Sequence, residues 1–236
     1  MIYLMSDIHG YSFEKILMLL KQSGFTANDY LYILGDVIDR GDDGIKMIQW
    51  MMEQSNVELI LGNHEAMLLS CDFIFEELND RFIGGLTQKK ISLLNTWQLN
   101  GAAPTLRELT ALNKEERENI LDYIRDAPLY GAITVGEKDY LLTHSGLGHF
   151  DERKKMPDYT PDELLWNRPR LDTRYFDDIT VIFGHTPTVE YGKQFAGRMI
   201  KTDTWINIDA GAACGYNPML LCLDTMQEFY SEKTET

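Results

Sequence analysis

The chain has 236 residues, of which 44% are hydrophobic, so it can bury the core of one large domain. Its formal net charge of −15 argues against partners that are themselves anionic, namely nucleic-acid backbones and membrane surfaces. Its three cysteines form no C-x-x-C pair, which suits a reducing compartment better than a disulfide framework. Without a leader-like segment or an apolar run approaching about 18 residues, the sequence predicts a soluble, cytoplasmic protein.

The first 70 residues repeat one pattern three times: an apolar strand, a polar loop and a helix. We expect strands at residues 2–5, 30–34 and 57–61, and helices at 13–20, at about 43–52 and from Ala66 onward. Strands that alternate with helices in this way form a parallel sheet. The polar loops then lie together at the carboxyl edge, where α/β sheets bind ligands. The sequence therefore predicts an α/β fold with a site at this edge.

The second polar loop, GDVIDRG at residues 35–41, concentrates the chemistry. Asp36 and Asp39 offer oxygen ligands for a cation, and the guanidinium fork of Arg40 fits phosphate oxygens. Gly41 is expected to open the next helix. If this loop stood alone, an ordinary polar turn with a helix cap would explain it equally well.

Residues 71–126 are helical by pattern and poorer in chemistry. The capping pattern at residues 113–116 predicts the start of one helix. We interpret residues 1–236 as a single domain that carries a mostly helical insertion at about 71–126, packed on the sheet and shaping the cleft.

Strand patterns return after Pro128, at residues 130–135, 140–143, 180–183, 205–208 and 219–223. His144 follows the second of these strands and His185 follows the third, so the second half of the chain also places histidines at strand ends. Residues 164–170, which include Trp166 and Arg168, read as a loop.

The histidines indicate the kind of site. Four of the five lie in polar clusters at strand ends: His9, His64, His144 and His185. A lone histidine is more often structural, but four at equivalent positions favour a metal centre. With Asp7, Asp36 and Asn63 they form a set of nitrogen and oxygen donors without sulfur, which suits two divalent ions such as Mn, Fe or Zn. Two ions about 3.5–4 Å apart can clamp the attacking and leaving oxygens of an in-line displacement.

Three motifs carry a family resemblance: DIHG at residues 7–10, GDVIDRG at 35–41 and GNHE at 62–65. They resemble the signatures of the phosphoprotein phosphatase (PPP) branch of the metallophosphoesterases. The likeness continues through His144, WNR at 166–168 and FGHTP at 183–187 into DAG at 209–211, and it is closest to small bacterial and phage serine/threonine phosphatases of the lambda type. It implies the calcineurin-like metallophosphoesterase fold, in which two mixed β-sheets are sandwiched between helices.

The resemblance also implies roles for individual residues. One ion would be held by Asp7 and His9, and Asp36 would bridge to a second ion held by Asn63, His144 and His185. In this family the residue at His64 donates a proton to the leaving group, and its partner at Asp39 orients it and raises its pKa. The residues matching the phosphate-gripping arginines are Arg40 and Arg168. The implied cofactors are two divalent ions, with Mn²⁺ the expected metal, and the implied nucleophile is a hydroxide bridging them.

Two positions depart from the family pattern. Ser6 replaces the usual glycine before the first motif, a small change that should be tolerated. Leu61 replaces the arginine that usually precedes GNHE. If position 61 faces the phosphate, the lost cation weakens phosphate binding, and Leu61→Arg should lower KM.

On this basis we predict a metal-dependent phosphomonoesterase, a serine/threonine protein phosphatase, whose substrate is a phosphorylated protein or a small phosphoester. The alternative is a symmetrical dinucleoside tetraphosphate hydrolase, which has the same metals and a related fold. That branch usually lacks the acid at Asp39 and carries an aspartate at Glu65. An inactive metal-binding scaffold is a further alternative, against which the full ligand set and His64 argue.

Overall fold

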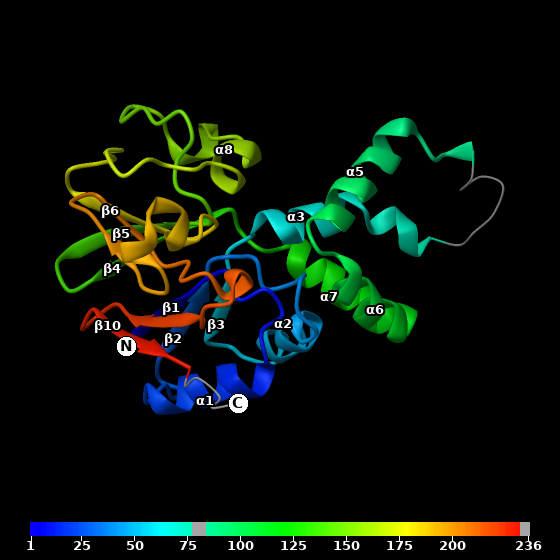
Figure 1. The fold of residues 1–236 in the computed structure, drawn as a ribbon, viewed down its shortest axis with the longest axis horizontal. Helices are drawn as coiled ribbons and strands as arrows, with labels where there is room; N and C mark the ends of the chain where they lie inside the picture. Colours follow the sequence, from blue (N-terminus) through cyan, green and yellow to red (C-terminus); the bar gives the residue numbers. More distant parts are fainter. Residues whose placement is uncertain (77–83, 232–236) are drawn as a thin grey trace.

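The computed structural model describes residues 1–76 and 84–231. Two five-stranded sheets pack against each other, with helices on the outside of both, and a group of helices projects to one side of the sheets (Figure 1). The predicted α/β class and the predicted arrangement of two mixed sheets between helices are confirmed.

The first sheet is built from both ends of the chain. Its strand order is β10-β9-β1-β2-β3. The three parallel strands are β1 (Ile2–Met5), β2 (Tyr30–Ile33) and β3 (Val57–Leu59). Two antiparallel strands close the other edge, β9 (Met219–Cys222) and β10 (Gln227–Tyr230).

The second sheet comes from the second half of the chain, in the order β4-β5-β6-β8-β7. Its parallel centre consists of β5 (Lys138–Thr143), β6 (Ile179–Phe183) and β8 (Trp205–Asn207). The antiparallel outer strands are β4 (Tyr130–Val135) and β7 (Ile200–Lys201). Each sheet thus contributes three parallel strands, and these six strand ends form the floor of the site described below.

The helices cover the outer faces. They are α1 (Phe13–Gln22), α2 (Gly44–Met52), α3 (Asn63–Ser70), α5 (Gln88–Leu99), α6 (Ala103–Ala111), α7 (Lys114–Arg125) and α8 (Pro161–Leu165). Short 3₁₀ turns are η1 (Asp72–Phe75), η2 (Met156–Asp158), η3 (Thr188–Tyr191), η4 (Lys193–Phe195) and η5 (Ala212–Cys214). In the part of the chain that the structure describes, every helix is too short or too polar to cross a membrane.

Apolar side chains of the two sheets interdigitate between them. Leu4, Leu34 and Ile60 from the first sheet meet Leu142 and Ile182 from the second in one buried cluster. A larger cluster fills the space between the first sheet and the helices, and a third lies on the outer face of the second sheet. Because both sheets are buried on both faces, their central strands are almost wholly apolar and polar residues gather at the strand ends.

Several predicted boundaries were wrong for identifiable reasons. Helix α2 begins at Gly44 and not at Gly41, because Gly41 is tied to the first loop: its N–H donates to His9 O at 3.0 Å. A Cβ on Gly41 would lie 2.3 Å from Gly10 O, so the two loops touch through their glycines. Helix α3 starts at Asn63, earlier than predicted, because the Glu65 carboxylate accepts the Gly62 N–H.

Other differences concern the second half of the chain. The hairpin strand β10 was not predicted, and Leu164 and Leu165 belong to α8 although residues 164–170 were expected to be a loop. Part of the expected helical insertion at about 71–126, namely residues 77–83, lies outside the described residues. The domain boundaries therefore stay a prediction, while α5, α6 and α7 within that stretch are helical.

Candidate active site

Six strand ends converge on one point, three from each sheet. Asp7, Asp36 and Asn63 follow β1, β2 and β3, and His144, His185 and Asp209 follow β5, β6 and β8. All six are at most 7% exposed. The structure therefore brings together the predicted ligand residues of both halves, and it adds Asp209, for which the sequence predicts a strand end but no role as a ligand.

The loops that carry these residues are conformationally strained. Eight non-glycine residues in the described part of the chain have positive φ, and six of them lie at this site: Asp7 (52°), His9 (45°), Asp36 (55°), Asp39 (70°), Arg40 (69°) and His185 (66°). Each such residue costs roughly 1–3 kcal/mol, and strain of this kind gathers at functional sites. The fold thus holds these side chains in positions that the isolated loops would not adopt.

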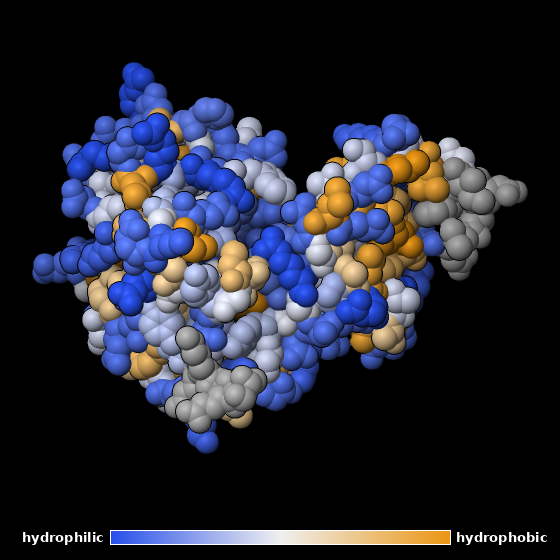
Figure 2. Space-filling model, viewed as in Figure 1, coloured by the Kyte–Doolittle hydropathy of each residue, from blue (hydrophilic) through white to orange (hydrophobic). Residues whose placement is uncertain are grey.

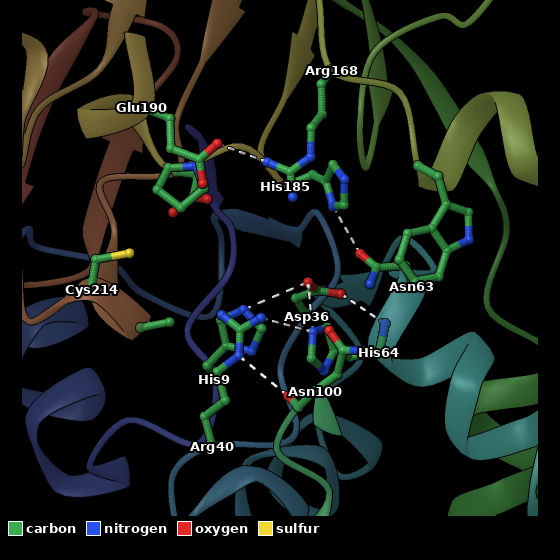
Figure 3. Close-up of a pocket in the computed structure, with 14 residues that line it drawn as sticks. His9, Asp36, Arg40, Asn63, His64, Asn100, Arg168, His185, Glu190 and Cys214 are labelled. Carbon is green, nitrogen blue, oxygen red and sulfur yellow. Dashed lines mark hydrogen bonds and ion pairs between the residues drawn. The ribbon is translucent and has the colours of Figure 1, made fainter. Parts of the chain in front are cut away.

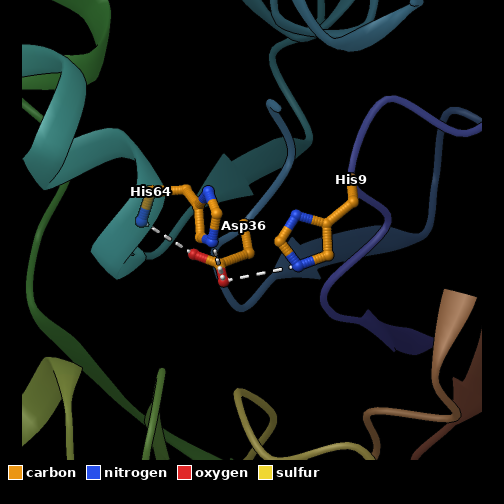
Figure 4. A group of neighbouring side chains, drawn as sticks. All are labelled: His9, Asp36 and His64. Atoms are coloured by element: carbon orange, nitrogen blue, oxygen red, sulfur yellow. Dashed lines mark hydrogen bonds and ion pairs between the residues drawn. The ribbon is translucent and has the colours of Figure 1, made fainter. Parts of the chain in front are cut away.

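The ligand atoms form two groups that share Asp36. Within each group the candidate atoms lie within 4.8 Å of one another: His9, Asp36 and His64 in one, and Asp36, His144 and His185 in the other. Asp36 Oδ2 is 3.6 Å from His9 Nε2, and Asp36 Oδ1 is 3.4 Å from His144 Nε2. Figures 3 and 4 show the Asp36 carboxylate between the rings of His9 and His64. One carboxylate is therefore positioned to bridge two ions.

Backbone carbonyls fix the orientation of two histidine rings. His9 Nδ1 lies 3.2 Å from Ile38 O, and His144 Nδ1 lies 2.7 Å from Leu34 O. A carbonyl only accepts, so each Nδ1 carries the proton and each Nε2 presents its lone pair toward Asp36. Metal-binding histidines are oriented in this way.

The second ligand group is drawn close together around Asn63. Asn63 Oδ1 lies 2.8 Å from both His144 Nε2 and His185 Nδ1, and His185 Nε2 is buried without a hydrogen-bond partner among the described residues. Ions hold nitrogen and oxygen ligands at about 2.0–2.2 Å, so ligand atoms about 3 Å apart can surround one. The donor set fits a divalent ion.

Buried negative charge supports the same fit. Burial raises the pKa of Asp7, and burial reinforced by neighbouring carboxylates raises the pKa of Asp36 and of Asp209 well above the usual range. Deeply buried carboxylates need compensating positive charge, and a bound cation is the strongest source of it. Asp7 lies outside the two ligand groups: its Oδ2 contacts the Ser6 hydroxyl and accepts the His185 N–H at 2.8 Å. Its predicted role as a ligand stays a prediction.

His64 and Asp39 form the expected pair. His64 Nδ1 lies 2.6 Å from Asp39 Oδ2, and Arg40 Nη2 lies 3.1 Å from His64 Nε2. Burial lowers the pKa of His64 to about 3, with Arg40 adding to the effect, and burial raises the pKa of Asp39 to about 6. Burial thus acts against the rise in the histidine pKa that Asp39 was expected to cause. A phosphate dianion next to the ring would favour the protonated form again.

Asp39 is held from the other side by the helical segment, which the sequence did not reveal. Its Oδ2 accepts from Trp97 Nε1 of α5 at 2.8 Å, and its Oδ1 accepts from Thr105 Oγ1 of α6 at 2.6 Å. The Asp39 N–H donates to the same Thr105 oxygen at 2.9 Å. Asp39, Trp97 and Thr105 are all 0% exposed. The segment expected to be poor in chemistry therefore fixes the partner of the proposed proton donor.

Glu65 organises the second loop. Its carboxylate is 0% exposed and accepts the backbone N–H groups of Asp36 and Val37 at 2.8 Å and of Ile38 at 3.3 Å. Three backbone donors on one carboxylate hold the loop that carries the bridging residue.

The mouth of the site carries the positive charge. A cavity of about 130 Å³ is lined by the buried residues His9, Asp36, Asn63 and His64 and by the exposed residues Arg40, Arg168 and Trp166. Arg168 also pairs with Glu190 at 3.0 Å (Figure 3). Leu61 is not among the lining residues and packs against the core of the first sheet. The expectation that an arginine at position 61 would reach the phosphate is therefore not supported.

The fold and the two ligand groups sharing one carboxylate define a metallophosphoesterase. The chain belongs to the calcineurin-like phosphoesterase family, whose sequence model matches residues 1–208.

Two relatives are named as bis(5'-nucleosyl)-tetraphosphatases, one symmetrical and one asymmetrical. A symmetrical bis(5'-nucleosyl)-tetraphosphatase of Buchnera aphidicola is 39% identical over 70 residues, which is 29% of this chain and 25% of the relative. An asymmetrical bis(5'-nucleosyl)-tetraphosphatase of Geobacillus thermodenitrificans is 26% identical over 85% of this chain and 84% of its own length. The chain thus matches only a quarter of the first relative but most of the second.

A solved structure described as a candidate diadenosine tetraphosphatase has the same fold. It superposes with a TM-score of 0.68 at 17% identity and covers 100% of this chain and 94% of its own. The Buchnera relative carries the name of the alternative activity, the symmetrical one, and the Geobacillus relative carries the name of the asymmetrical counterpart; neither is named as a lambda-type phosphatase.

Proposed function

We propose that this protein is a metal-dependent hydrolase of dinucleoside polyphosphates. The observation that carries the proposal is the pair of ligand groups sharing Asp36 beneath two arginines, in a chain similar to a dinucleoside tetraphosphatase over 85% of its length. A catalytically inactive scaffold is disfavoured because the site also contains the hydrogen-bonded pair of His64 and Asp39, which can move a proton.

The proposed metal ligands are Asp7, His9 and Asp36 for one ion and Asp36, Asn63, His144 and His185 for the other. Bound divalent ions, with Mn²⁺ the expected metal, supply a water that ionises near neutral pH and an electrostatic clamp on the phosphoryl oxygens. Asp36 would contribute one oxygen to each ion, because its Oδ2 faces His9 and its Oδ1 faces His144.

The remaining residues act on the substrate. Arg40 and Arg168 at the mouth bind phosphate oxygens and orient the chain of phosphates. His64 lies beside Asp36 at the floor and donates a proton to the leaving oxygen, while Asp39 keeps its ring in place. A cavity of about 130 Å³ accommodates a phosphoryl group and leaves the nucleosides outside it.

The second candidate, a serine/threonine protein phosphatase, is favoured by the His64–Asp39 pair. An alkoxide leaving from a serine needs a proton donor far more than a nucleotide phosphate does. Here His64 Nδ1 lies 2.6 Å from Asp39 Oδ2, so hydrolysis of phosphopeptides is the competing expectation.

The test is a comparison of kcat/KM for diadenosine tetraphosphate, a phosphoserine peptide and p-nitrophenyl phosphate, each with Mn²⁺. The proposal expects the highest value for the dinucleotide. Chromatography of its products then identifies the bond cleaved, since two ADP indicate symmetrical cleavage and ATP with AMP indicates asymmetrical cleavage. A higher kcat/KM for the phosphopeptide would replace the proposal with the second candidate.

A further inference from the structure

A second cavity lies beside the phosphate cavity, between helices α3, α5 and α8. It holds about 310 Å³ and is lined by Ala66, Met67 and Ser70 of α3, Leu93 and Thr96 of α5, and Pro161, Asp162, Leu165 and Trp166 around α8. Figure 2 shows the surface hollowed between the rounded body and the projecting helical part, and Figure 1 shows α8 and α5 on opposite sides of that hollow. Its volume is at the lower end of the range of small-molecule pockets, about 300–1,000 Å³.

Trp166 joins this cavity to the candidate active site. It lines both cavities, and its ring stands edge-on to His185 with the ring centroids 6.0 Å apart. Trp166 is nevertheless 43% exposed, so part of a large aromatic surface is open to a ligand. A molecule whose phosphate is bound by the arginines could therefore extend over Trp166 without leaving the protein surface.

The two cavities differ in the chemistry of their walls. The phosphate cavity contains Arg40 and Arg168, whereas none of the described residues that line the second cavity is cationic. Its walls are Met67, Leu93, Leu165 and Trp166, which suit an apolar, flat group and not a further phosphate.

The polar atoms of the second cavity act as acceptors. The Ser70 hydroxyl donates to Ala66 O at 2.9 Å and the Thr96 hydroxyl donates to Ser92 O at 3.0 Å, so both protons are already used within their helices. Their oxygens, and the carboxylate of Asp162 at the rim, remain to accept from a ligand. A flat ring with an amino group at its edge meets these requirements, as adenine does.

The cavity also lies on the proposed leaving-group side. Met67 is three residues after His64 on α3, so the two side chains share one face of that helix. His64 is the proposed proton donor to the leaving group. The group that departs would therefore begin over the first turn of α3 and continue toward Met67 and Trp166.

We infer that this cavity, which we call the base pocket (residues 66, 67, 70, 93, 96, 161, 162, 165 and 166), binds the nucleobase of the departing nucleotide, with its ring against Trp166. The inference rests on the proposed function and adds the location and chemistry of a specificity subsite. It assigns to α5 a contact with substrate in addition to its contact with Asp39.

The test uses two half-buried leucines that follow each other on α5. Leu93 lines the base pocket and Leu94 does not, although both pack against the same core. For Leu93→Ala we expect KM for diadenosine tetraphosphate to rise about fivefold, from the loss of about 1 kcal/mol of apolar contact. For Leu94→Ala we expect a change of less than about twofold. Melting temperatures of both variants report any general destabilisation.

Substitutions of Trp166 should change KM for diadenosine tetraphosphate more than Leu93→Ala does. Trp166→Ala should raise KM for diadenosine tetraphosphate by about tenfold or more, as stacking on an aromatic residue predicts, and Trp166→Phe should restore part of the affinity. KM for inorganic tripolyphosphate, which has the phosphates without a base, should stay within about twofold for Leu93→Ala, because Leu93 does not line the phosphate cavity.

The outcomes separate the two proposals. If the wild-type protein does not hydrolyse diadenosine tetraphosphate, the proposed function and the base pocket both fail. If it does, but Leu93→Ala and Leu94→Ala behave alike, only the base pocket fails. The assignment to a nucleobase is also overturned if Leu93→Ala raises KM for tripolyphosphate as much as KM for diadenosine tetraphosphate, or if it raises KM only for a phosphopeptide.

Discussion

Replacing Trp97 by phenylalanine would test whether the helical segment controls proton donation. Trp97→Phe keeps an aromatic ring in the core but removes the N–H that donates to Asp39 Oδ2 at 2.8 Å. The same oxygen is bound to His64 Nδ1 at 2.6 Å, so loss of one donor frees the carboxylate to move away from the histidine. A hydrogen bond to a charged group is worth about 1.5–3 kcal/mol, which corresponds to a loss of about 10- to 150-fold in the step that needs it.

The expected loss depends on the leaving group. With a phosphoserine peptide, whose alkoxide must be protonated, kcat should fall about tenfold or more. With p-nitrophenyl phosphate, whose leaving group is already acidic, the loss should be under about threefold. KM should change little for either ester, because Trp97 is fully buried and does not line the cavity.

A second substitution tests the other oxygen of Asp39. Thr105→Val removes the hydroxyl that donates to Oδ1 and leaves the shape of the side chain unchanged, while Thr105→Ser keeps the hydroxyl and should restore most of the activity. Trp50→Phe, at a half-buried tryptophan packed on Phe13, is the control for losing an indole elsewhere.

The reasoning would be refuted by a particular pattern of kinetics. If Trp97→Phe slows both esters equally in a folded protein with unchanged metal content, the indole supports the structure in general and not the proton donor. If it slows neither, the contact with Asp39 is dispensable.

Four further predictions follow from the same geometry. Asp36→Asn should impair binding of both ions, because each of its oxygens faces a different ligand group, and metal counting on the purified variant that still finds two ions would contradict the bridge. His64→Asn should lower turnover of poor leaving groups by about 10²–10⁴-fold with near-normal metal content, and a lost ion would instead make His64 a ligand. Leu61→Arg should leave KM for phosphoesters within about twofold and lower the melting temperature, because the half-buried Leu61 side chain packs against the core and not into the phosphate cavity; a clear drop in KM would contradict that placement. The Glu108 carboxylate accepts a backbone N–H in the first turn of α2, and burial raises its pKa to about 7 from 4.5. The folded state therefore favours the neutral carboxyl, and the stability of the protein should decline as the pH rises from about 4.5 to 7. Glu108→Gln should flatten this decline in melting temperatures measured across that pH range, and an unchanged slope would exclude Glu108 as its source.

The parts of the site that could be predicted are those set by local pattern. Asp36, Asn63 and His144 each stand one residue beyond an apolar run, and parallel strands bring such positions to one edge whatever the rest of the chain does. The same rule would have selected Asp209 after β8 if a carboxylate without a neighbouring histidine had been given equal weight.

The contacts with Asp39 could not be read from the sequence. Trp97 lies 58 residues from Asp39 and Thr105 lies 66 residues from it, and each sits in a helix where an indole or a hydroxyl usually serves packing or capping. Only the placement of α5 and α6 over the second loop gives them a role. Arg40 shows the same dependence, since its N–H donates to Gly101 O at 2.9 Å between those helices.

Two parts of the chain have different roles in the site: the strand ends hold the ligand groups, and helix α5 contacts Asp39 and lines the base pocket. The strand ends fix the ligand groups through strained loops that Glu65 holds in place, and these loops tolerate little change. Helix α5 instead contacts the catalytic machinery at one residue, Trp97, and presents Leu93, one turn earlier, to the base pocket.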